Sequence, residues 1–290
     1  RYQLFLNEED AGVVRAVLTG DKAEMDEKTE QLYIQAGIVH VLAISGLHIS
    51  IIGMSVYTLL KRLGVGLKGS ACLSGFIVLS YGVMTGFGPS TERAVIMFLV
   101  RMGAVYLGCT YDFLSALSFS ALILFVSRPL SILQTGVWFS FAAVLSIGVL
   151  WPAIEKCIPW QYAKTRNYKI EHLKKSMGVK TTIREWIERM IRYIGPSAAV
   201  TIGTLPLTAF CYGAVPLVGF FLNLLVLPLM NLFVPMALGA GGVSLLSISM
   251  AGFCGGTLHF ILQINRFFCE KMLFMPFSGW RTGGPPFVWL

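Results

Sequence analysis

The sequence predicts an all-α, polytopic transmembrane helix bundle with broken or re-entrant helices and short interfacial helices. Hydrophobic residues make up 55% of the 290 residues and charged residues only 13%, whereas about 25% of the residues in a soluble domain are charged. The mean hydropathy is +0.70, and several apolar runs reach the roughly 20 residues that a helix needs to cross a bilayer. These observations exclude an ordinary soluble globular domain.

The first 36 residues differ from the rest, which predicts an extracellular or interfacial helical segment at 1–36 ahead of a transmembrane domain at 37–290. Asn7 is followed by three acidic residues, which is typical of a helix start, and Gly20 is a typical helix end. Between them lies an apolar stripe made of Val13, Val14, Val17 and Leu18. We expect two short surface helices here. Because Arg1 opens the chain without a signal sequence, we also expect an internal piece of a longer protein.

Apolar stretches predict the membrane spans. They lie at about 38–60, 70–87, 92–108, 113–127, 135–152, 196–213, 217–238 and 243–263. The fourth and fifth are short, so we expect either to tilt or to be re-entrant. The later stretch "RFFCEKMLFMPFSGW" is amphiphilic and predicts an interfacial segment rather than a span.

The basic residues predict the orientation. Lys61, Arg62 and Lys68 lie between the first two spans, and the polar loop at about 156–192 holds ten Lys or Arg residues against three Glu. Four spans separate these two loops, so both lie on one side of the membrane, which the positive-inside rule identifies as the cytoplasm. The N-terminal and C-terminal ends are then expected outside.

The basic loop has two interpretations. Its cations include Lys174, Lys175, Lys180 and Arg184. Such residues usually act as topology signals and contact membrane lipids. The alternative is a docking site for a cytoplasmic partner or for emerging nucleic acid.

Two arginines fall inside a predicted span, Arg93 and Arg101, eight residues apart. On an α-helix this spacing is about 12 Å along the axis and about 80° around it. A charge near mid-membrane costs about 2.5–3.5 kcal/mol, so such residues normally face the bundle interior or water. A conduction path for an anion is one interpretation. The other is ion pairing, with Glu92 for Arg93 and with Asp112 for Arg101.

The stretch "GIVHVLAISGLHIS" places His40, Ser45 and His48 in an otherwise apolar segment. Ser45 and His48 could act as nucleophile and base, but no acid is placed to orient the imidazole. Lining of a pore and simple packing remain the two stronger alternatives. Small residues accompany them and would let another helix approach closely, namely Gly46, Ser50 and Gly53.

A second polar group lies in the later spans, where Asn223 and Asn231 are eight residues apart. Prolines stand nearby, at positions 206, 228 and 235, and predict interrupted helices. Interrupted helices are typical of transport paths and also of irregular bundles. His259 is interpreted as a satisfied core or interfacial histidine.

The sequence contains no cluster of Cys and His at metal-ligand spacing and no nucleotide-binding GxxxxGK[ST] motif. The six cysteines are far apart and are expected to be packed free thiols. We therefore expect no metal, no cofactor and no enzymatic activity. If the movement of a substrate is driven by ATP, a partner protein would have to bind and hydrolyse the ATP.

Several stretches together resemble the competence domain of the ComEC-type DNA-uptake channel family. The longest is "GIVHVLAISGLH" at 37–48, which follows a short "GD" helical segment. The others are "GFGPSTERAVIM" with Arg93, "GVWFSFAAVLSIG", and "GTLPLTAFCYGAVPLVGFFLNLLVLPL" with Pro206, Asn223 and Pro228. The resemblance covers nearly the whole chain. Trp138 stands where the family often has Gln, so no polar lining role is expected there.

The resemblance implies a channel that conducts single-stranded DNA across the bacterial cytoplasmic membrane during natural transformation. It also implies partners: membrane lipids, a cytoplasmic helicase-like motor, and extracellular OB-like and metallo-β-lactamase-like domains of the same full-length chain. The oligomeric state is left open. Sequence-independent binders of single strands combine positive grooves with aromatic stacking. The residues expected along the conduit are His40, Ser45, His48, Arg93, Arg101, Asn223 and Asn231.

One alternative function belongs to another class: a small-solute permease with polar sites at broken helices. The combination of the His–Ser–Gly–His stretch with the Pro–Ser–x–x–Arg stretch favours the DNA channel over it. An intramembrane hydrolase would require Ser45 to be reactive.

Overall fold

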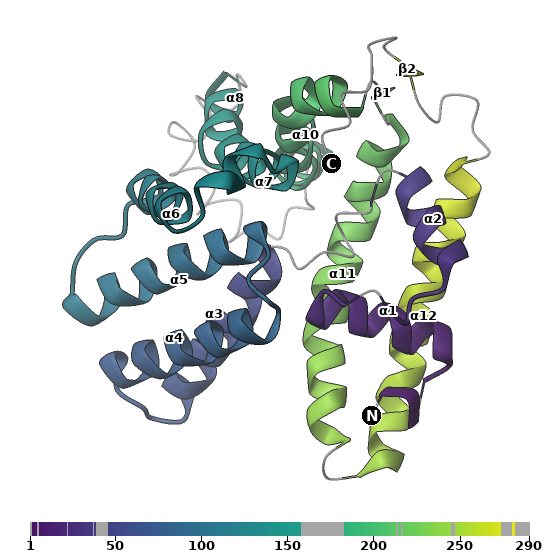
Figure 1. The fold of residues 1–290 in the computed structure, drawn as a ribbon, viewed down its shortest axis with the longest axis horizontal. Helices are drawn as coiled ribbons and strands as arrows, with labels where there is room; N and C mark the ends of the chain where they lie inside the picture. The colour runs from purple at the N-terminus through teal and green to yellow at the C-terminus, as the bar shows by residue number, and fades with distance from the viewer. Residues whose placement is uncertain are drawn as a thin grey trace. The chain divides into compact units, whose positions relative to one another are not determined.

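The computed structural model describes residues 2–4, 6–21, 23–36, 38, 46–157, 183–212, 214–215, 217–244, 247–273 and 280–281. Helices make up nearly all of its regular structure (Figure 1), and the strands β1 (Ala214–Val215) and β2 (Trp280–Arg281) have two residues each. The predicted all-α class is therefore confirmed. The chain divides into two compact units, the first made of 1–137 and 216–281 and the second of 138–215 and 282–290.

The first unit holds most of the helices. They are the 3-10 helix η1 (Tyr2–Leu4), α1 (Glu8–Thr19), α2 (Glu27–Gln35), α3 (Gly46–Arg62), α4 (Leu67–Met84), α5 (Pro89–Leu107), α6 (Phe113–Ser127), the 3-10 helix η3 (Pro129–Leu133), α11 (Leu217–Val243) and α12 (Ile248–Leu273). Helix α1 begins after Asn7 and ends at Gly20, whose φ of 76° is left-handed, as the sequence predicted.

One core of the first unit lies where α1 crosses α11 and α12 (Figure 1). The apolar stripe of α1 is at most 5% exposed and packs with buried side chains of α11 such as Phe233. Tyr33 of α2 belongs to the same core. Two short helices are thus found in the first 36 residues, and the hairpin of α11 and α12 covers the apolar face of α1.

The other core of the first unit joins α3, α4 and α5, whose buried side chains include Ile49, Val78 and Phe98. Gly53 lies between these helices. A Cβ at Gly53 would collide with the ring of Phe98 and would lie 2.8 Å from Cγ2 of Val78. The predicted small-residue face is therefore confirmed at Gly53, where the missing side chain allows close helix packing.

The second unit contains the later part of α7 (Thr135–Leu145), the π-helix η4 (Ser146–Leu150), α8 (Trp151–Cys157) and α10 (Ile183–Tyr212). Its packing rests on two glycines of α10. A Cβ at Gly195 would collide with the ring of Trp151, and a Cβ at Gly203 would collide with Oγ of Ser146. Ala199 lies midway between the two glycines and is fully buried. A strip of small residues therefore receives η4 and α8.

Four helical stretches in the described residues are long and apolar enough to cross a membrane. They are Leu67–Met84, Thr135–Cys157, Met190–Cys211 and Phe221–Val243, and α6 is a shorter apolar helix. Helices α3, α5 and α12 lie at the other predicted spans. The chain is a membrane protein with an all-α bundle.

The prolines do not end helices. Helix α10 continues through Pro196 and Pro206, and α11 continues through Pro228 and Pro235. Each proline removes one backbone donor, which a helix inside a membrane bundle tolerates when neighbours satisfy the freed carbonyl. The irregular turn within a candidate span is instead the π-helix η4.

Candidate functional site

The candidate site begins at the first turn of α3. This helix starts at Gly46, and His48 in its first turn is 3% exposed. His40 and Ser45 lie outside the described residues. The structure therefore tests one of the three polar residues of the "GIVHVLAISGLHIS" stretch, and it places His48 in the protein interior.

Arg93 brings a charge to the same place. It is the fifth residue of α5, just after the first turn, and is 6% exposed. Its Nη1 is 3.5 Å from Sδ of Met97, and its Nη2 would lie 2.7 Å from a Cβ at Gly46. The guanidinium group therefore lies directly against the first residue of α3.

This arrangement has a clear electrostatic character. The first residues of an α-helix carry backbone N–H groups without intrahelical acceptors and a partial positive charge. A guanidinium group adds a full positive charge and five N–H donors. Two positive groups that meet at Gly46 repel each other and attract an anion. The chemistry of this place suits a phosphate or a carboxylate.

Glu92, the acidic neighbour of Arg93, forms its ion pair elsewhere. Its Oε2 lies 3.8 Å from Nη1 of Arg128, and the hydroxyl of Ser127 donates to its Oε1 at 3.5 Å. Arg128 also donates to the carbonyl of Phe87 at 3.3 Å. Glu92 therefore joins the start of α5 to the end of α6.

Arg101 has a different environment from Arg93. It is exposed on the surface of the first unit, and among the described residues it has no carboxylate within ion-pair distance. Asp112, its expected partner, instead accepts a hydrogen bond from the N–H of Ser115 at 2.7 Å and so caps α6. This hydrogen bonding lowers the pKa of the Asp112 carboxyl group. Burial raises the pKa of the nearby Tyr111 phenol, while Arg101 acts in the opposite direction.

The remaining predicted residues are only partly described. Asn223 lies on α11, and its Oδ1 is buried without a hydrogen-bond partner among the described residues. Asn231 lies on the same helix and Arg184 lies on α10, but the structure does not describe their side chains. Lys174, Lys175 and Lys180 lie outside the described residues. The structure therefore brings together the start of α3 and Arg93 and leaves the basic loop untested.

Sequence reasoning missed the polar contacts that hold α1 in place. Asp10, 4% exposed, pairs with Nδ1 of His259 on α12. Glu9 accepts a hydrogen bond from Nη1 of Arg266 at 2.9 Å. The interpretation of His259 as a satisfied histidine is confirmed. The available signal was the position of Asp10, three residues before Val13, on the apolar stripe of α1.

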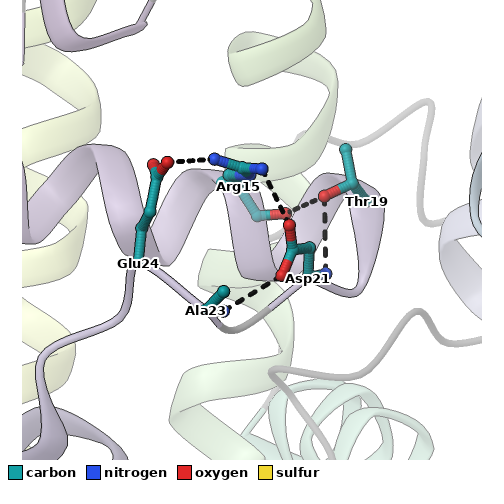
Figure 2. Close-up of polar contacts among 5 residues, drawn as sticks. All are labelled: Arg15, Thr19, Asp21, Ala23 and Glu24. Carbon is teal, nitrogen blue, oxygen red and sulfur yellow. Dashed lines mark hydrogen bonds and ion pairs between the residues drawn. The ribbon is translucent and has the colours of Figure 1, made fainter.

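A second set of polar contacts closes the turn between α1 and α2. Figure 2 shows Arg15 reaching both Glu24 and Asp21, with the Asp21 pair at 2.8 Å. The carboxylate of Asp21 also accepts a hydrogen bond from the N–H of Ala23 at 3.0 Å. The side chains of Arg15, Asp21 and Glu24 are half exposed, and Arg15 points toward the α1–α2 turn. The turn is therefore a structural feature rather than a second anion site.

The described residues contain no group of three or more His, Cys, Asp or Glu side chains that could hold a metal ion. The six cysteines are free. Within the described part of the chain, the candidate site therefore consists of Arg93, Gly46 and the buried His48, which lies two residues after Gly46 on α3.

Comparison with known proteins gives a consistent result. The family model described as "Competence protein" matches residues 17–290. ComE operon protein 3 of Bacillus subtilis is 25% identical over 241 residues, which cover 83% of this chain and 27% of that protein. Competence protein ComA of Neisseria gonorrhoeae is 26% identical over 47% of this chain and 21% of its own length. Recombination protein 2 of Haemophilus influenzae is 25% identical over 79% of this chain and 28% of its own length.

The chain thus spans between a fifth and a third of the length of these relatives. No solved structure matches it.

Proposed function

Because this chain belongs to the competence-protein family, we propose that it forms the membrane-embedded path along which single-stranded DNA crosses the bacterial cytoplasmic membrane during natural transformation. Its apolar helices provide the membrane bundle that such a path requires. ComE operon protein 3 matches over 83% of the chain, and competence protein ComA matches over 47% of it. They support a role in DNA uptake, and the conduction of single strands is the specific step that we propose.

The observation that carries the proposal is the burial of Arg93 against the first turn of α3. A cation kept inside a membrane bundle costs about 2.5–3.5 kcal/mol on the lenient insertion scale, and such residues mark pathways for ions or substrates. Here the guanidinium group meets a helix N-terminus, and both attract phosphate. A conduit must also release its substrate, so few cations suit it better than many.

Arg101 extends the same proposal. It lies two turns further along α5 and is exposed. We propose that a strand passes Arg101 and Arg93 on one route. His40, Ser45, His48, Asn223 and Asn231 would provide the uncharged hydrogen-bonding groups of the path.

The orientation and the partners belong to the same proposal. The positive-inside rule places the basic loop at 156–192 in the cytoplasm and both ends of the chain outside. Lys174, Lys175, Lys180 and Arg184 could then receive the emerging strand. Force would come from a cytoplasmic helicase-like motor. The extracellular OB-like and metallo-β-lactamase-like domains of the full-length protein would prepare the strand.

We also propose that this domain is not an enzyme. The test is labelling of the full-length protein with a fluorophosphonate probe. We expect no label at Ser45. Stoichiometric labelling that His48→Ala abolishes would identify an intramembrane serine hydrolase instead.

The main experiment measures uptake of labelled DNA in transformable cells that carry the full-length protein with Arg93→Ala, Arg101→Ala or His48→Ala. Membrane abundance is measured in parallel. Arg15→Ala is the matched control, because it removes an arginine of α1 that pairs only with the α1–α2 turn among the described residues. We expect the first three variants to lose internalised single strands at normal abundance while DNA still binds outside.

Three results would contradict the proposal. Normal uptake in all three variants would remove these residues from the DNA path. Equal loss of uptake and of protein would make them folding residues. A control that loses as much uptake as Arg93→Ala would show that any missing arginine has the same effect.

A further inference from the structure

The turn between α3 and α4 has an unusual surface for a loop. Hydrogen bonds fix its backbone: the N–H of Gly64 donates to Lys61 at 3.1 Å, and the N–H of Val65 donates to Leu60 at 3.0 Å. Gly64 has a φ of 86°, which only glycine adopts easily, so the turn closes tightly at the end of α3. The backbone of this turn is therefore fixed.

Those side chains are apolar and point outward. Leu63 is 70% exposed, Leu67 is 56% exposed, and Leu59 one turn earlier is 57% exposed. A loop that faces water is normally polar, with Gly, Asn, Asp or Ser at its tip. Exposed leucines at a fixed turn indicate a surface that another apolar phase covers.

Three cations frame this apolar tip. Lys61 and Arg62 close α3, and Lys68 lies in the first turn of α4. Among the described residues none of the three has a carboxylate within ion-pair distance. The tip therefore carries three positive charges that no carboxylate in the described part of the chain pairs with.

Two tyrosines lie under the lysines. The ammonium group of Lys61 is 5.8 Å from the ring centre of Tyr57, and that of Lys68 is 5.4 Å from the ring centre of Tyr106. Tyrosines and lysines together are typical of the layer where hydrocarbon meets headgroups. A base-stacking surface for a nucleic acid would instead need free ring faces.

The lengths of the helices bear on where the turn lies relative to the bilayer. Helix α3 has 17 residues and α4 has 18, which correspond to about 26 and 27 Å at 1.5 Å per residue. The hydrocarbon layer of a bilayer is about 30 Å thick. Helix α4 is long and apolar enough to cross this layer, so the turn at its N-terminal end lies near a surface of the membrane.

From these observations we infer that the α3–α4 turn is a binding surface for anionic phospholipids. The leucines of the tip lie among the upper parts of the acyl chains. Lys61, Arg62 and Lys68 bind the headgroup phosphates. This surface is independent of the proposed DNA path at Arg93, and its occupant is part of the bilayer rather than a transported strand.

The test uses the full-length protein in nanodiscs of phosphatidylcholine with increasing fractions of phosphatidylglycerol. Native mass spectrometry counts the bound phosphatidylglycerol, and the melting temperature follows its effect. The test variant is the triple Lys61→Gln, Arg62→Gln, Lys68→Gln. The control triple Arg15→Gln, Arg128→Gln, Lys271→Gln removes the same charge from other parts of the first unit.

We expect wild type and control to bind phosphatidylglycerol and to melt at a higher temperature with it. The test triple should need a much larger fraction for half-saturation, because each cation near an anionic surface changes the apparent affinity about fivefold. A second variant, Leu63→Ser with Leu67→Ser, should weaken lipid binding while all charges remain. If the test triple does not fold, Arg62→Gln alone, which contacts neither ring, should still shift half-saturation about fivefold.

Three results would overturn the inference. The test triple could bind phosphatidylglycerol as wild type does. Inorganic phosphate added to phosphatidylcholine nanodiscs could reproduce the whole effect, which would indicate a free-anion site. The triple could also keep its lipid response and lose binding of a fluorescent oligothymidylate, which would identify a nucleic-acid surface.

Discussion

Arg93 and Arg101 are the same residue type on the same helix, yet they occupy opposite environments. Arg93 is 6% exposed and lies against the start of α3, whereas Arg101 is exposed and lies near Tyr111. Their spacing of eight residues predicts similar sides of α5. The difference arises because α3 begins beside Arg93, while no described helix covers Arg101.

This comparison shows what burial adds to charge. An exposed arginine attracts an anion weakly, because water and salt screen it. A buried arginine keeps its field, because the surrounding protein has a low effective dielectric constant. On one helix the chain therefore has an exposed cation whose field is screened and a buried cation whose field is not.

The largest effect is expected from a substitution that disrupts the core of α3, α4 and α5, because α5 carries both arginines. Gly53→Val should abolish the folded bundle of α3, α4 and α5, because the new side chain would overlap Phe98 and Val78. Overpacking of this kind costs about 3 kcal/mol or more. Membrane abundance and thermal melting in detergent measure the loss.

The control for that variant is Gly103→Ala. Gly103 lies on α5 between helix residues and has no atom within 4 Å of its Cβ position. Alanine there should raise stability by about 0.5–1 kcal/mol through helix propensity. A stable Gly53→Val protein would show that α5 does not lie as close to α3 as described.

The next largest effect is a difference in DNA uptake between lysine substitutions at Arg93 and at Arg101. Arg93→Lys should reduce DNA uptake about tenfold or more at normal abundance, because a lysine loses the planar fork that lies between Gly46 and Met97. Arg101→Lys should keep near-normal uptake, because an exposed cation needs only its charge. Internalised labelled DNA measures both. Equal losses in the two variants would mean that burial does not distinguish their roles.

A smaller effect is expected at Asp10, which is buried like Arg93 and forms an ion pair with His259. Asp10→Asn should lower the free energy of unfolding by about 1–2 kcal/mol, because Asp10 is buried while its partner His259 is 38% exposed. Glu9→Gln should cost less than about 0.5 kcal/mol, because the Glu9–Arg266 pair is exposed. Chemical unfolding in detergent gives both values. If Glu9→Gln costs more, the exposed pair is the main attachment of α1.

The smallest effect concerns the exposed pairs of the α1–α2 turn. The hydrogen bond from Ala23, together with Arg15, lowers the pKa of Asp21 in the folded protein. A lowered carboxyl pKa stabilises the fold above the unfolded value of about 3.9 and loses this effect as the pH falls through the folded value.

Asp21→Asn should therefore leave melting at pH 7 nearly unchanged and should reduce its dependence on pH below about 4. Melting curves between pH 3 and pH 7 test this. A large loss at pH 7 would show that the turn contributes more than its exposure indicates.

Local features of the fold could be predicted from the sequence. Asn7 and Gly20 stand at the two ends of α1, where the left-handed backbone of Gly20 ends the helix and the side chain of Asn7 makes no capping hydrogen bond. Gly53 was expected to admit a neighbouring helix, and it does. The overall class followed from hydropathy alone.

Contacts between distant segments could not be predicted. The Asp10–His259 pair joins residues 249 positions apart, and no pattern within α1 reveals which helix will cover it. Glu92 was considered as a partner of Arg93, but the fold brings the end of α6 beside it and Arg128 takes that place. The continuity of α10 and α11 through their prolines likewise depends on tertiary packing rather than on local preference.

The π-helix η4 changes the angular positions, around the helix axis, of the side chains that follow it in the span. Ser146 and Trp151 are five residues apart, which would place them about 140° apart around a regular α-helix. Both nevertheless meet α10, at Gly203 and at Gly195, because the N–H of Trp151 bonds to the carbonyl of Ser146. The segment thus holds one residue more than its turns require. If one residue were removed between Ser146 and Trp151, an uninterrupted α-helix would keep both contacts with α10. The span can therefore gain or lose a residue at this turn without rotating the helical segments on either side.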